Sequence, residues 1–159
     1  MIRKARKEDF DTILDIYARA REFMAANGNA SQWAGGYPQV EMLQDDMKKE
    51  QLYVYEDEDG IGAVFVFFIG DEPWYHEIRD GVWVNDKPYG TLHRIAVDKY
   101  GKGLASICLN WCYEQCGNMR GDTHENNKSM QRLFEKNGYT RCGMITIDDG
   151  TDRIAYQKA

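Results

Sequence analysis

One stretch in the second half of the chain constrains the fold more than any other. It reads as a strand over residues 92–97, a turn over residues 98–103 and a helix over Leu104–Cys116. Gly101 and Gly103 let the backbone bend and approach a ligand without a Cβ in the way. The first turn of a helix leaves backbone N–H groups without helical partners, and such groups bind anions. The stretch therefore predicts a phosphate-binding turn between a strand and a helix.

Hydrophobic periodicity predicts the elements that surround this stretch. Helices are expected at residues 8–26, around 40–47 and after the N-cap Asn127, and strands at residues 2–5, 52–56, 61–69, 119–124, 139–147 and 153–157. Residues 63–69 are apolar on both faces, which indicates a central strand. Residues 70–90 show no clear period, and loops of that length are often functional. The order of elements predicts one α/β domain over residues 1–159, with a mixed, mainly antiparallel sheet and helices on both faces.

Charge and hydropathy exclude two classes of partner. The 20 basic and 26 acidic residues give a net charge of −6 at pH 7, which repels the phosphate backbone of nucleic acids. No apolar run approaches the roughly 20 residues that a membrane-spanning helix needs. The basic start is followed by Lys7, Glu8 and Asp9 rather than by an apolar stretch, so no signal peptide is expected. We therefore expect a cytoplasmic protein that binds neither nucleic acids nor membranes.

The cysteines are expected to be free thiols in the core rather than metal ligands. Cys108, Cys112 and Cys116 recur every four residues along one predicted helix, and Cys142 stands alone. Zinc sites instead use close pairs completed by a distant second pair. A stripe at helical spacing is formed by Leu104, Ile107, Cys108, Trp111 and Cys112. We expect this stripe to be the buried face of the helix, and we expect no bound metal.

A second motif lies at residues 127–139, which read Asn-Lys-Ser-Met-Gln-Arg-Leu-Phe-Glu-Lys-Asn-Gly-Tyr. With the turn at residues 100–105, Tyr-Gly-Lys-Gly-Leu-Ala, it resembles the GNAT superfamily of acyl-CoA-dependent N-acetyltransferases. The family turn, Gln/Arg-x-x-Gly-x-Gly/Ala, fits with Tyr100 in place of the leading Gln or Arg. The later family pattern, Asn-x-x-Ala-x-x-Leu-Tyr-x-x-x-Gly-Phe, departs from this chain at Met130 and Phe134. It fits at Asn127, Leu133, Gly138 and Tyr139.

The resemblance implies a GNAT-like fold and a site for acetyl-CoA as co-substrate. Backbone N–H groups from Gly101 to Ser106 would hold the pyrophosphate, and residues 95–97 would pair with the pantetheine arm like an added strand. Asn127 either hydrogen-bonds the pantetheine or serves only as the N-cap of the last helix. The expected cofactor residues are Ile95, Ala96, Val97, Tyr100, Gly101, Lys102, Gly103, Leu104, Ala105, Ser106, Asn127 and Phe134. A homodimer is common in families that look like this one.

The implied reaction needs a base for the acceptor amine, and a histidine has a suitable pKa. His93 lies two residues before the pantetheine-pairing segment. It resembles in position a histidine that serves as base in some aralkylamine-acetylating relatives. A strand histidine bonded only to a neighbour fits the sequence equally well. His124, beside Glu125 at the end of the next strand, is the rival candidate.

The general acid is the point at which the chain departs most from its family. In the common pattern a Tyr at the position of Phe134 protonates the leaving thiolate, and a phenyl ring cannot do so. Another hydroxyl such as that of Tyr139 or Ser129 takes over, solvent supplies the proton, or the protein binds the cofactor with little turnover. We expect activity to be retained, because a coenzyme A thiolate is a fairly good leaving group.

The acceptor site is expected between the glycine-rich connection near residue 33 and the loop 70–90. An apolar slot could be formed by Trp33, Tyr37, Trp74 and Tyr75, and Asp71, Glu72 or Glu77 could attract a cationic amine. Our expectation is an enzyme that moves acetyl from acetyl-CoA to a primary amine of a small molecule by direct attack in a ternary complex. The alternatives are a CoA-binding sensor or scaffold, and an acetyltransferase of protein N-termini or lysines.

Overall fold

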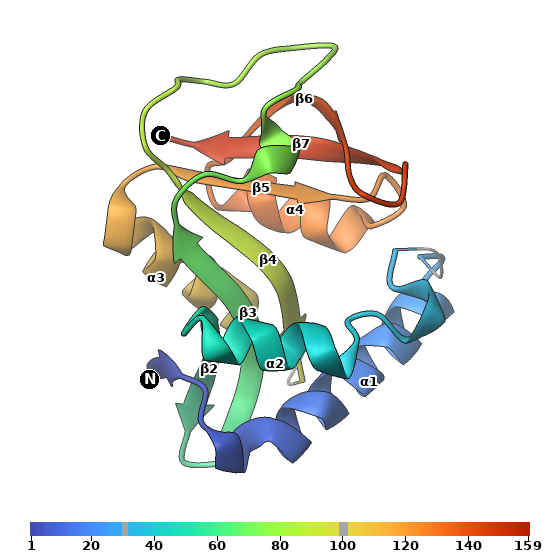
Figure 1. The fold of residues 1–159 in the computed structure, drawn as a ribbon, viewed down its shortest axis with the longest axis vertical. Helices are drawn as coiled ribbons and strands as arrows, with labels where there is room; N and C mark the ends of the chain where they lie inside the picture. The colour runs from blue at the N-terminus through green and yellow to red at the C-terminus, as the bar shows by residue number, and fades with distance from the viewer. Residues whose placement is uncertain (30–31, 99–101) are drawn as a thin grey trace. The chain divides into compact units, whose positions relative to one another are not determined.

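The computed structural model describes residues 1–29, 32–98 and 102–159 (Figure 1). Its α-helices are α1 (Phe10–Ala26), α2 (Val40–Lys48), α3 (Leu104–Cys116) and α4 (Lys128–Lys136), and short 3-10 turns are η1 (Lys7–Asp9), η2 (Ala34–Gly36) and η3 (Pro73–Tyr75). The strands are β1 (Ile2–Lys4), β2 (Leu52–Asp57), β3 (Gly60–Ile69), β4 (Gly90–Val97), β5 (Met119–Thr123), β6 (Thr140–Thr146) and β7 (Asp152–Lys158). Every helix and strand expected from the sequence is present, with ends that differ by one or two residues.

The strands follow the hydrogen-bonded order β1-β2-β3-β4-β5-β7-β6. The β4–β5 pair is parallel, whereas β1–β2, β2–β3, β5–β7 and β6–β7 are antiparallel. A parallel pair needs a crossover connection, and α3 provides it. β3 lies between β2 and β4, and its residues 62–67 are all buried. The expected α/β class, with a mixed, mainly antiparallel sheet, is confirmed.

The chain divides into two compact units, which we describe separately. The first unit contains residues 1–67 and 94–108, and the second contains residues 68–93 and 109–159. β3, β4 and α3 each contribute residues to both units.

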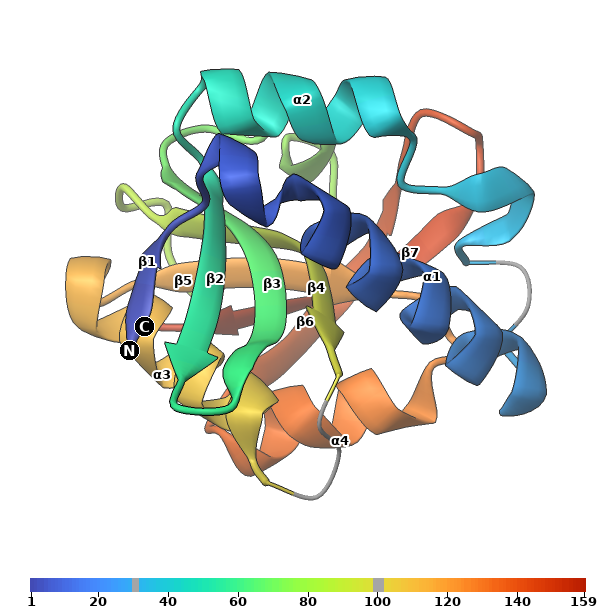
Figure 2. The same cartoon turned by 90° about the horizontal axis from the view of Figure 1, so that it is seen from below.

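The core of the first unit forms between β3 and the helices on its two faces. α1 buries Ile13, Ile16, Tyr17 and Ala20, which share one face at helical spacing, and α2 buries Leu43. In both views α1 and α2 lie on one face of β2 and β3, and the first turns of α3 lie on the other (Figures 1 and 2). This part of the chain therefore has helices on both faces of its strands, as expected.

The buried face of α3 differs from the stripe predicted from the sequence. Leu104, Cys108 and Cys112 are buried, but the side chain of Ile107 is 44% exposed, and Leu109 is buried instead. Successive helical residues are rotated by about 100°, so a face centred on positions 104, 108 and 112 can include 109 and leave 107 outside. The expectation was wrong for Ile107. The cysteines are free thiols, as expected.

In the second unit, side chains pack on both faces of β5 and β7. One face carries a cluster of buried residues from loop 70–89 and from β6 and β7, namely Tyr75, Tyr89, Ile145 and Ala155. On the other face, the ring of Phe134 from α4 stacks on Tyr156 of β7, with ring centroids 4.7 Å apart. Figure 1 shows η3 in front of β7 and α4 behind the strands.

Within the described ranges, the longest apolar helical stretch falls short of what crossing a membrane requires.

Replacing Asp9 with Asn is expected to lower the free energy of unfolding at pH 7 by about 1–3 kcal/mol. Arg3 donates to the Asp9 carboxylate at 2.7 and 3.0 Å, and the Arg6 amide donates to it at 2.7 Å. The hydrogen bonds from Arg3, chiefly, lower the pKa of Asp9. The stabilisation is therefore present above the unfolded-state pKa of about 3.9 and is lost as the pH falls through the folded-state pKa.

Urea unfolding at pH 7, 5 and 3 measures this effect, because the difference between wild type and Asp9→Asn should shrink toward pH 3. The matched control is Asp45→Asn, which removes the same charge from an exposed pair with Lys49. Such a pair contributes about 0.5 kcal/mol or less. Equal losses in the two variants would contradict the prediction.

Candidate functional site

Arg94, at the centre of β4, adopts a left-handed backbone conformation, with φ of 51°. That conformation costs a residue other than glycine about 1–2 kcal/mol. The guanidinium of Arg94 donates to both oxygens of Asp46 on α2, at 3.1 and 2.7 Å, and to the Tyr37 hydroxyl at 3.3 Å. The Tyr17 hydroxyl donates to the Arg94 carbonyl at 2.6 Å. These bonds hold the strained residue in place.

The second half of β4 presents a free main-chain edge on the side away from β3. Pairing of the described β4 residues with β5 is confined to Gly90 and Thr91. On its other side β4 is hydrogen-bonded to β3. This pairing reaches the C-terminal end of β4, where the Asp98 amide donates to the Gly62 carbonyl at 2.9 Å. Ala96 is buried, and Ile95 and Val97 are half-buried. An extended ligand could therefore pair with residues 95–97 as the sequence predicts.

Gly103 directly precedes the N-terminus of α3. It has φ of 68°, and a Cβ at this position would meet no heavy atom of the described residues within 4 Å. The first bond of the helix runs from the Ile107 amide to the Gly103 carbonyl at 3.1 Å. The amides of Leu104 and Ala105 lie in the first turn of α3, so the helix contains no carbonyl four residues earlier to accept their hydrogen bonds. Amides in this position point out of the helix end and suit an anion. The candidates Tyr100 and Gly101 lie outside the described residues, while Lys102 is exposed and Ser106 half-buried.

His93, the first candidate base, forms a close pair with Glu72. His93 Nε2 and Glu72 Oε2 are 2.6 Å apart, and the two side chains are only 19% and 10% exposed. A carboxylate accepts hydrogen bonds, so in the neutral ring this contact assigns the proton to Nε2 and the lone pair to Nδ1. The imidazole also packs near the rings of Phe68 and Tyr75, at centroid distances of 6.1 and 6.2 Å. The ring therefore has a fixed tautomer and a fixed orientation.

Glu72 is held on its own side by three neighbours. Its amide donates to the Tyr89 hydroxyl at 2.8 Å, and its second carboxylate oxygen accepts the Trp74 amide at 3.3 Å. The Tyr75 amide donates to the Glu72 carbonyl at 2.9 Å, and the Tyr75 hydroxyl donates to Asp122 of β5 at 2.6 Å. Glu72 was expected to attract an amine directly. The structure places its carboxylate on His93 instead, and this pairing spans 21 positions of the chain.

His124, the rival base, is engaged in a local turn. Its Nδ1 accepts the Asn126 amide at 3.0 Å. Burial, with a smaller contribution from the Arg153 charge, lowers the pKa of His124. A histidine whose Nδ1 lone pair is already bonded has only Nε2 left, and that nitrogen carries the proton in the neutral ring. His124 is therefore less suited than His93 to accept a proton.

The candidates on and after α4 are mainly structural. The Asn127 side chain caps α4 by accepting the Met130 amide at 3.0 Å. Phe134 is 1% exposed. Its ring packs so closely against Gly121 that a Cβ at that glycine would lie 2.8 Å from the Phe134 Cζ atom. Tyr139 is 5% exposed, and its buried hydroxyl has no partner among the described residues. Burial raises the pKa of Tyr139 far above its ordinary value.

The aromatic candidates for the acceptor fall into separate surroundings. Trp33 is 7% exposed and packs between Tyr17 and Tyr37, with centroid distances of 5.6 and 6.2 Å. It supports the bonds around Arg94 rather than facing an open slot. Trp74 is 43% exposed at η3.

Loop 70–89 is fastened to β5, β6 and β7. The Arg120 guanidinium lies between the rings of Trp83 and Tyr89, 4.1 and 4.2 Å from their centroids, and donates to the Asn85 carbonyl at 2.7 Å. The Val84 amide donates to the Gln157 side chain at 2.8 Å. Arg79 pairs with Met144 of β6 through two backbone hydrogen bonds of 3.0 and 2.8 Å. The loop thus forms a wall that these three strands hold in place.

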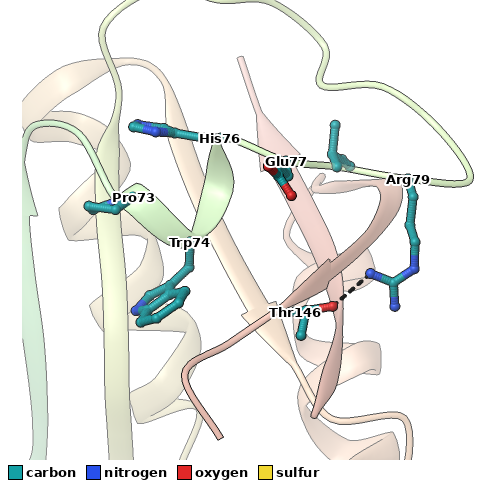
Figure 3. Close-up of a pocket in the computed structure, with 7 residues that line it drawn as sticks. Pro73, Trp74, His76, Glu77, Arg79 and Thr146 are labelled. Atoms are coloured by element: carbon teal, nitrogen blue, oxygen red, sulfur yellow. Dashed lines mark hydrogen bonds between the residues drawn. The ribbon is translucent and has the colours of Figure 1, made fainter. Parts of the chain in front are cut away.

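A hollow of about 520 Å³ opens in this wall (Figure 3). It is lined by Pro73, Trp74, His76, Glu77, Ile78, Arg79 and Thr146. In Figure 3, Glu77 points toward Thr146 of β6, whose hydroxyl accepts a hydrogen bond from Arg79 at 2.8 Å, and the ring of Trp74 extends from η3 to the opposite side of the view. Glu72, the partner of His93, directly precedes the lining residue Pro73 in the chain.

Sequence reasoning missed the contacts that position the site. Asp46 and Arg94 are 48 positions apart, and Arg120 with Trp83 and Tyr89 combines residues from a strand and a loop. An Arg directly before the apolar residues 95–97 was the one available signal, because a buried charge needs a partner. Nothing in the sequence indicated which acid that partner was.

Comparison with known proteins relates the whole chain to acetyltransferases. A GNAT-family acetyltransferase structure from Streptococcus agalactiae is 33% identical, with a TM-score of 0.91, over 99% of this chain and 94% of that one. A GNAT-family structure from Listeria monocytogenes is 18% identical, with a TM-score of 0.73, over 99% and 93% of the two chains. A putative acetyltransferase from Staphylococcus aureus is 28% identical, with a TM-score of 0.70, over 99% and 97%. No protein-family model and no curated protein sequence matches.

Proposed function

The chain belongs to the GNAT family of acetyltransferases, and on that basis we propose that it transfers acetyl from acetyl-CoA to a neutral primary amine of a small molecule. The observation that carries the proposal is the His93–Glu72 pair, with its 2.6 Å contact, on the strand whose later residues form the free edge. We place the reaction in the cytoplasm, where free thiols such as those of this chain persist.

The described residues fit acetyl-CoA at two places in the first unit. The main chain of residues 95–97 offers an extended edge for the amide groups of the pantetheine arm. Gly103 leaves open space at the N-terminus of α3, and the exposed Lys102 beside it adds positive charge for a phosphate. Bound there, acetyl-CoA supplies a thioester whose acetyl carbon an amine can attack.

His93 is the group that we propose accepts the proton of the acceptor amine. Glu72 holds the ring with its Nδ1 lone pair available, and its negative charge stabilises the imidazolium that forms. As the C–N bond forms and the C–S bond breaks, one proton leaves the nitrogen and one must reach the thiolate. Water supplies the second proton in this scheme, because Phe134 has no hydroxyl and the Tyr139 hydroxyl is buried.

Thiol release tests the proposal directly. The purified protein is incubated with acetyl-CoA and a panel of small primary amines, and the free thiol of CoA is followed with a colorimetric reagent. Reactions without acceptor correct for the thiols of the protein, of which Cys108 and Cys112 are buried. We expect thiol release that depends on an amine. Tight binding of acetyl-CoA with no acceptor-dependent release would contradict the proposal and favour a CoA-binding sensor. Release with lysine peptides or protein N-termini alone would contradict the small-molecule assignment.

A further inference from the structure

The His93–Glu72 pair lies beyond the point at which backbone hydrogen bonds join β4 to β5. Within the described residues, β4 pairs with β5 at Gly90 and Thr91 only, and His93 follows two residues later. Glu72 lies outside the strands, in loop 70–89. On the β5 side, the link between this pair and the sheet therefore depends on side chains.

Tyr75 provides that link. Its amide donates to the Glu72 carbonyl at 2.9 Å, and its ring packs near the imidazole of His93, with centroids 6.2 Å apart. Its hydroxyl donates to Asp122 of β5 at 2.6 Å. The side chain is only 1% exposed. One buried tyrosine thus contacts both members of the pair and the neighbouring strand.

Asp122 lies on the face of the sheet that carries Tyr75. It is paired with Ala155 of β7, and Ala155 belongs to the same buried cluster as Tyr75. Residues directly opposite each other on antiparallel strands share a face. Burial, with the Asp122 charge as the second cause, raises the pKa of Tyr75 well above its ordinary value. The hydroxyl therefore stays protonated and donates to Asp122 throughout the neutral pH range.

The Tyr75 hydroxyl depends on this single bond. Among the residues that the structure describes, Asp122 is the only hydrogen-bond acceptor of the hydroxyl. Without an acceptor, a buried hydroxyl is costly, so the ring would have to move toward another partner. Because Glu72 and His93 both contact Tyr75, such a movement would displace them as well. A displacement of about 1 Å in a catalytic group can lower the rate about a hundredfold.

We propose that Asp122 is a positioning residue, which acts through the Tyr75 hydroxyl to hold Glu72 and His93 in the arrangement that proton transfer needs. This inference rests on the proposed function, since it concerns how the proposed base is held. It assigns Asp122 no contact with the acceptor or with acetyl-CoA. Position 122 has to supply an oxygen that accepts a hydrogen bond, and the negative charge of the carboxylate is not required.

The kinetics of three variants test this assignment. Tyr75→Phe keeps the ring and removes the hydroxyl, whereas Asp122→Val keeps the approximate size of the side chain and removes the acceptor. Each is expected to lower kcat about three- to thirtyfold, with a KM for acetyl-CoA near that of wild type. Asp122→Asn keeps an acceptor oxygen and should retain most of the activity. A loss in Asp122→Asn as large as that in Asp122→Val would overturn the proposal, because it would show that the charge itself acts in the reaction.

The losses in Tyr75→Phe and Asp122→Val should not multiply. Both variants remove the same hydrogen bond, so the double variant is expected to have the kcat of either single variant. Tyr113→Phe is the matched control, because it removes a tyrosine hydroxyl that donates to the Ala159 carbonyl at 3.2 Å. Its kcat should equal that of wild type. Multiplied losses in the double variant, or an equal loss in Tyr113→Phe, would contradict the assignment.

NMR of the ring nitrogens of His93 separates this proposal from the proposed reaction, because it needs no turnover. In wild type, the neutral ring should carry its proton on Nε2, as the contact with Glu72 assigns. Tyr75→Phe and Asp122→Val should give a mixture of the two tautomers, and Asp122→Asn should not. This pattern supports the positioning role even if no amine releases thiol from acetyl-CoA. Ring nitrogen shifts that stay at their wild-type values in Tyr75→Phe and Asp122→Val would overturn it, whether or not the protein transfers acetyl.

Discussion

Replacing His93 with Ala is expected to lower kcat/KM by about 10²- to 10⁴-fold, the usual contribution of a general base. The loss should be smallest at the acid end of the profile, where a protonated base cannot accept a proton from the amine, and one ionisation should vanish from the pH–rate profile. Steady-state kinetics over pH 6–9 measure both effects. The fold should persist, because His93 is only half-buried.

Glu72→Gln separates positioning from catalysis. The amide keeps the size of the side chain but cannot stabilise the imidazolium, so kcat should fall while the KM for acetyl-CoA stays close to that of wild type. His124→Ala is the comparison variant. Loss of the ionisation in His124→Ala, with retention in His93→Ala, would show that the base is His124.

Replacing Gly81 with Ala is expected to cost about 3 kcal/mol or more of folding stability and to reduce activity sharply. A Cβ at Gly81 would lie 1.8 Å from the Cys142 carbonyl oxygen of β6, and backbone cannot rotate away as a side chain can. Loop 70–89 would have to lift from β6, which would disturb the Arg79–Met144 bridge and, with it, the position of Glu72. Thermal unfolding and kcat/KM measure the two consequences.

Gly150→Ala is the control for this prediction. It adds the same methyl group at a loop glycine whose φ of 79° is strained for alanine but whose surroundings are open within 4 Å. Its cost should be about 1–2 kcal/mol, with activity retained. If Gly81→Ala were no more damaging than Gly150→Ala, the close contact with β6 would not be what holds the loop.

The elements and the motif were readable from the sequence because they depend on local rules. The spacing of apolar residues gave the helices and strands, and the glycines of the turn preceding Leu104 marked the start of α3. The partners of charged groups were not readable in this way. The sequence around Glu72 looks the same whether its carboxylate faces an amine or His93. Only the folding of loop 70–89 decides between these two partners.

The same limit explains Trp33 and Tyr37. Aromatic residues in a glycine-rich connection suggest a binding slot, yet here they surround the Arg94–Asp46 pair. That arrangement is needed because Arg94 has a left-handed backbone conformation inside a strand. No local sequence pattern predicts such a conformation. Position 107 failed for a different reason, since helical spacing defines a stripe but not its exact centre.

The fastening of loop 70–89 has a consequence for how the hollow can change. Trp83, Arg120 and Gln157 anchor the loop, whereas Trp74 and Glu77 line the hollow without anchoring it. Substitutions at these two lining positions can therefore change the surface of the hollow while the contacts that hold the loop to the strands remain.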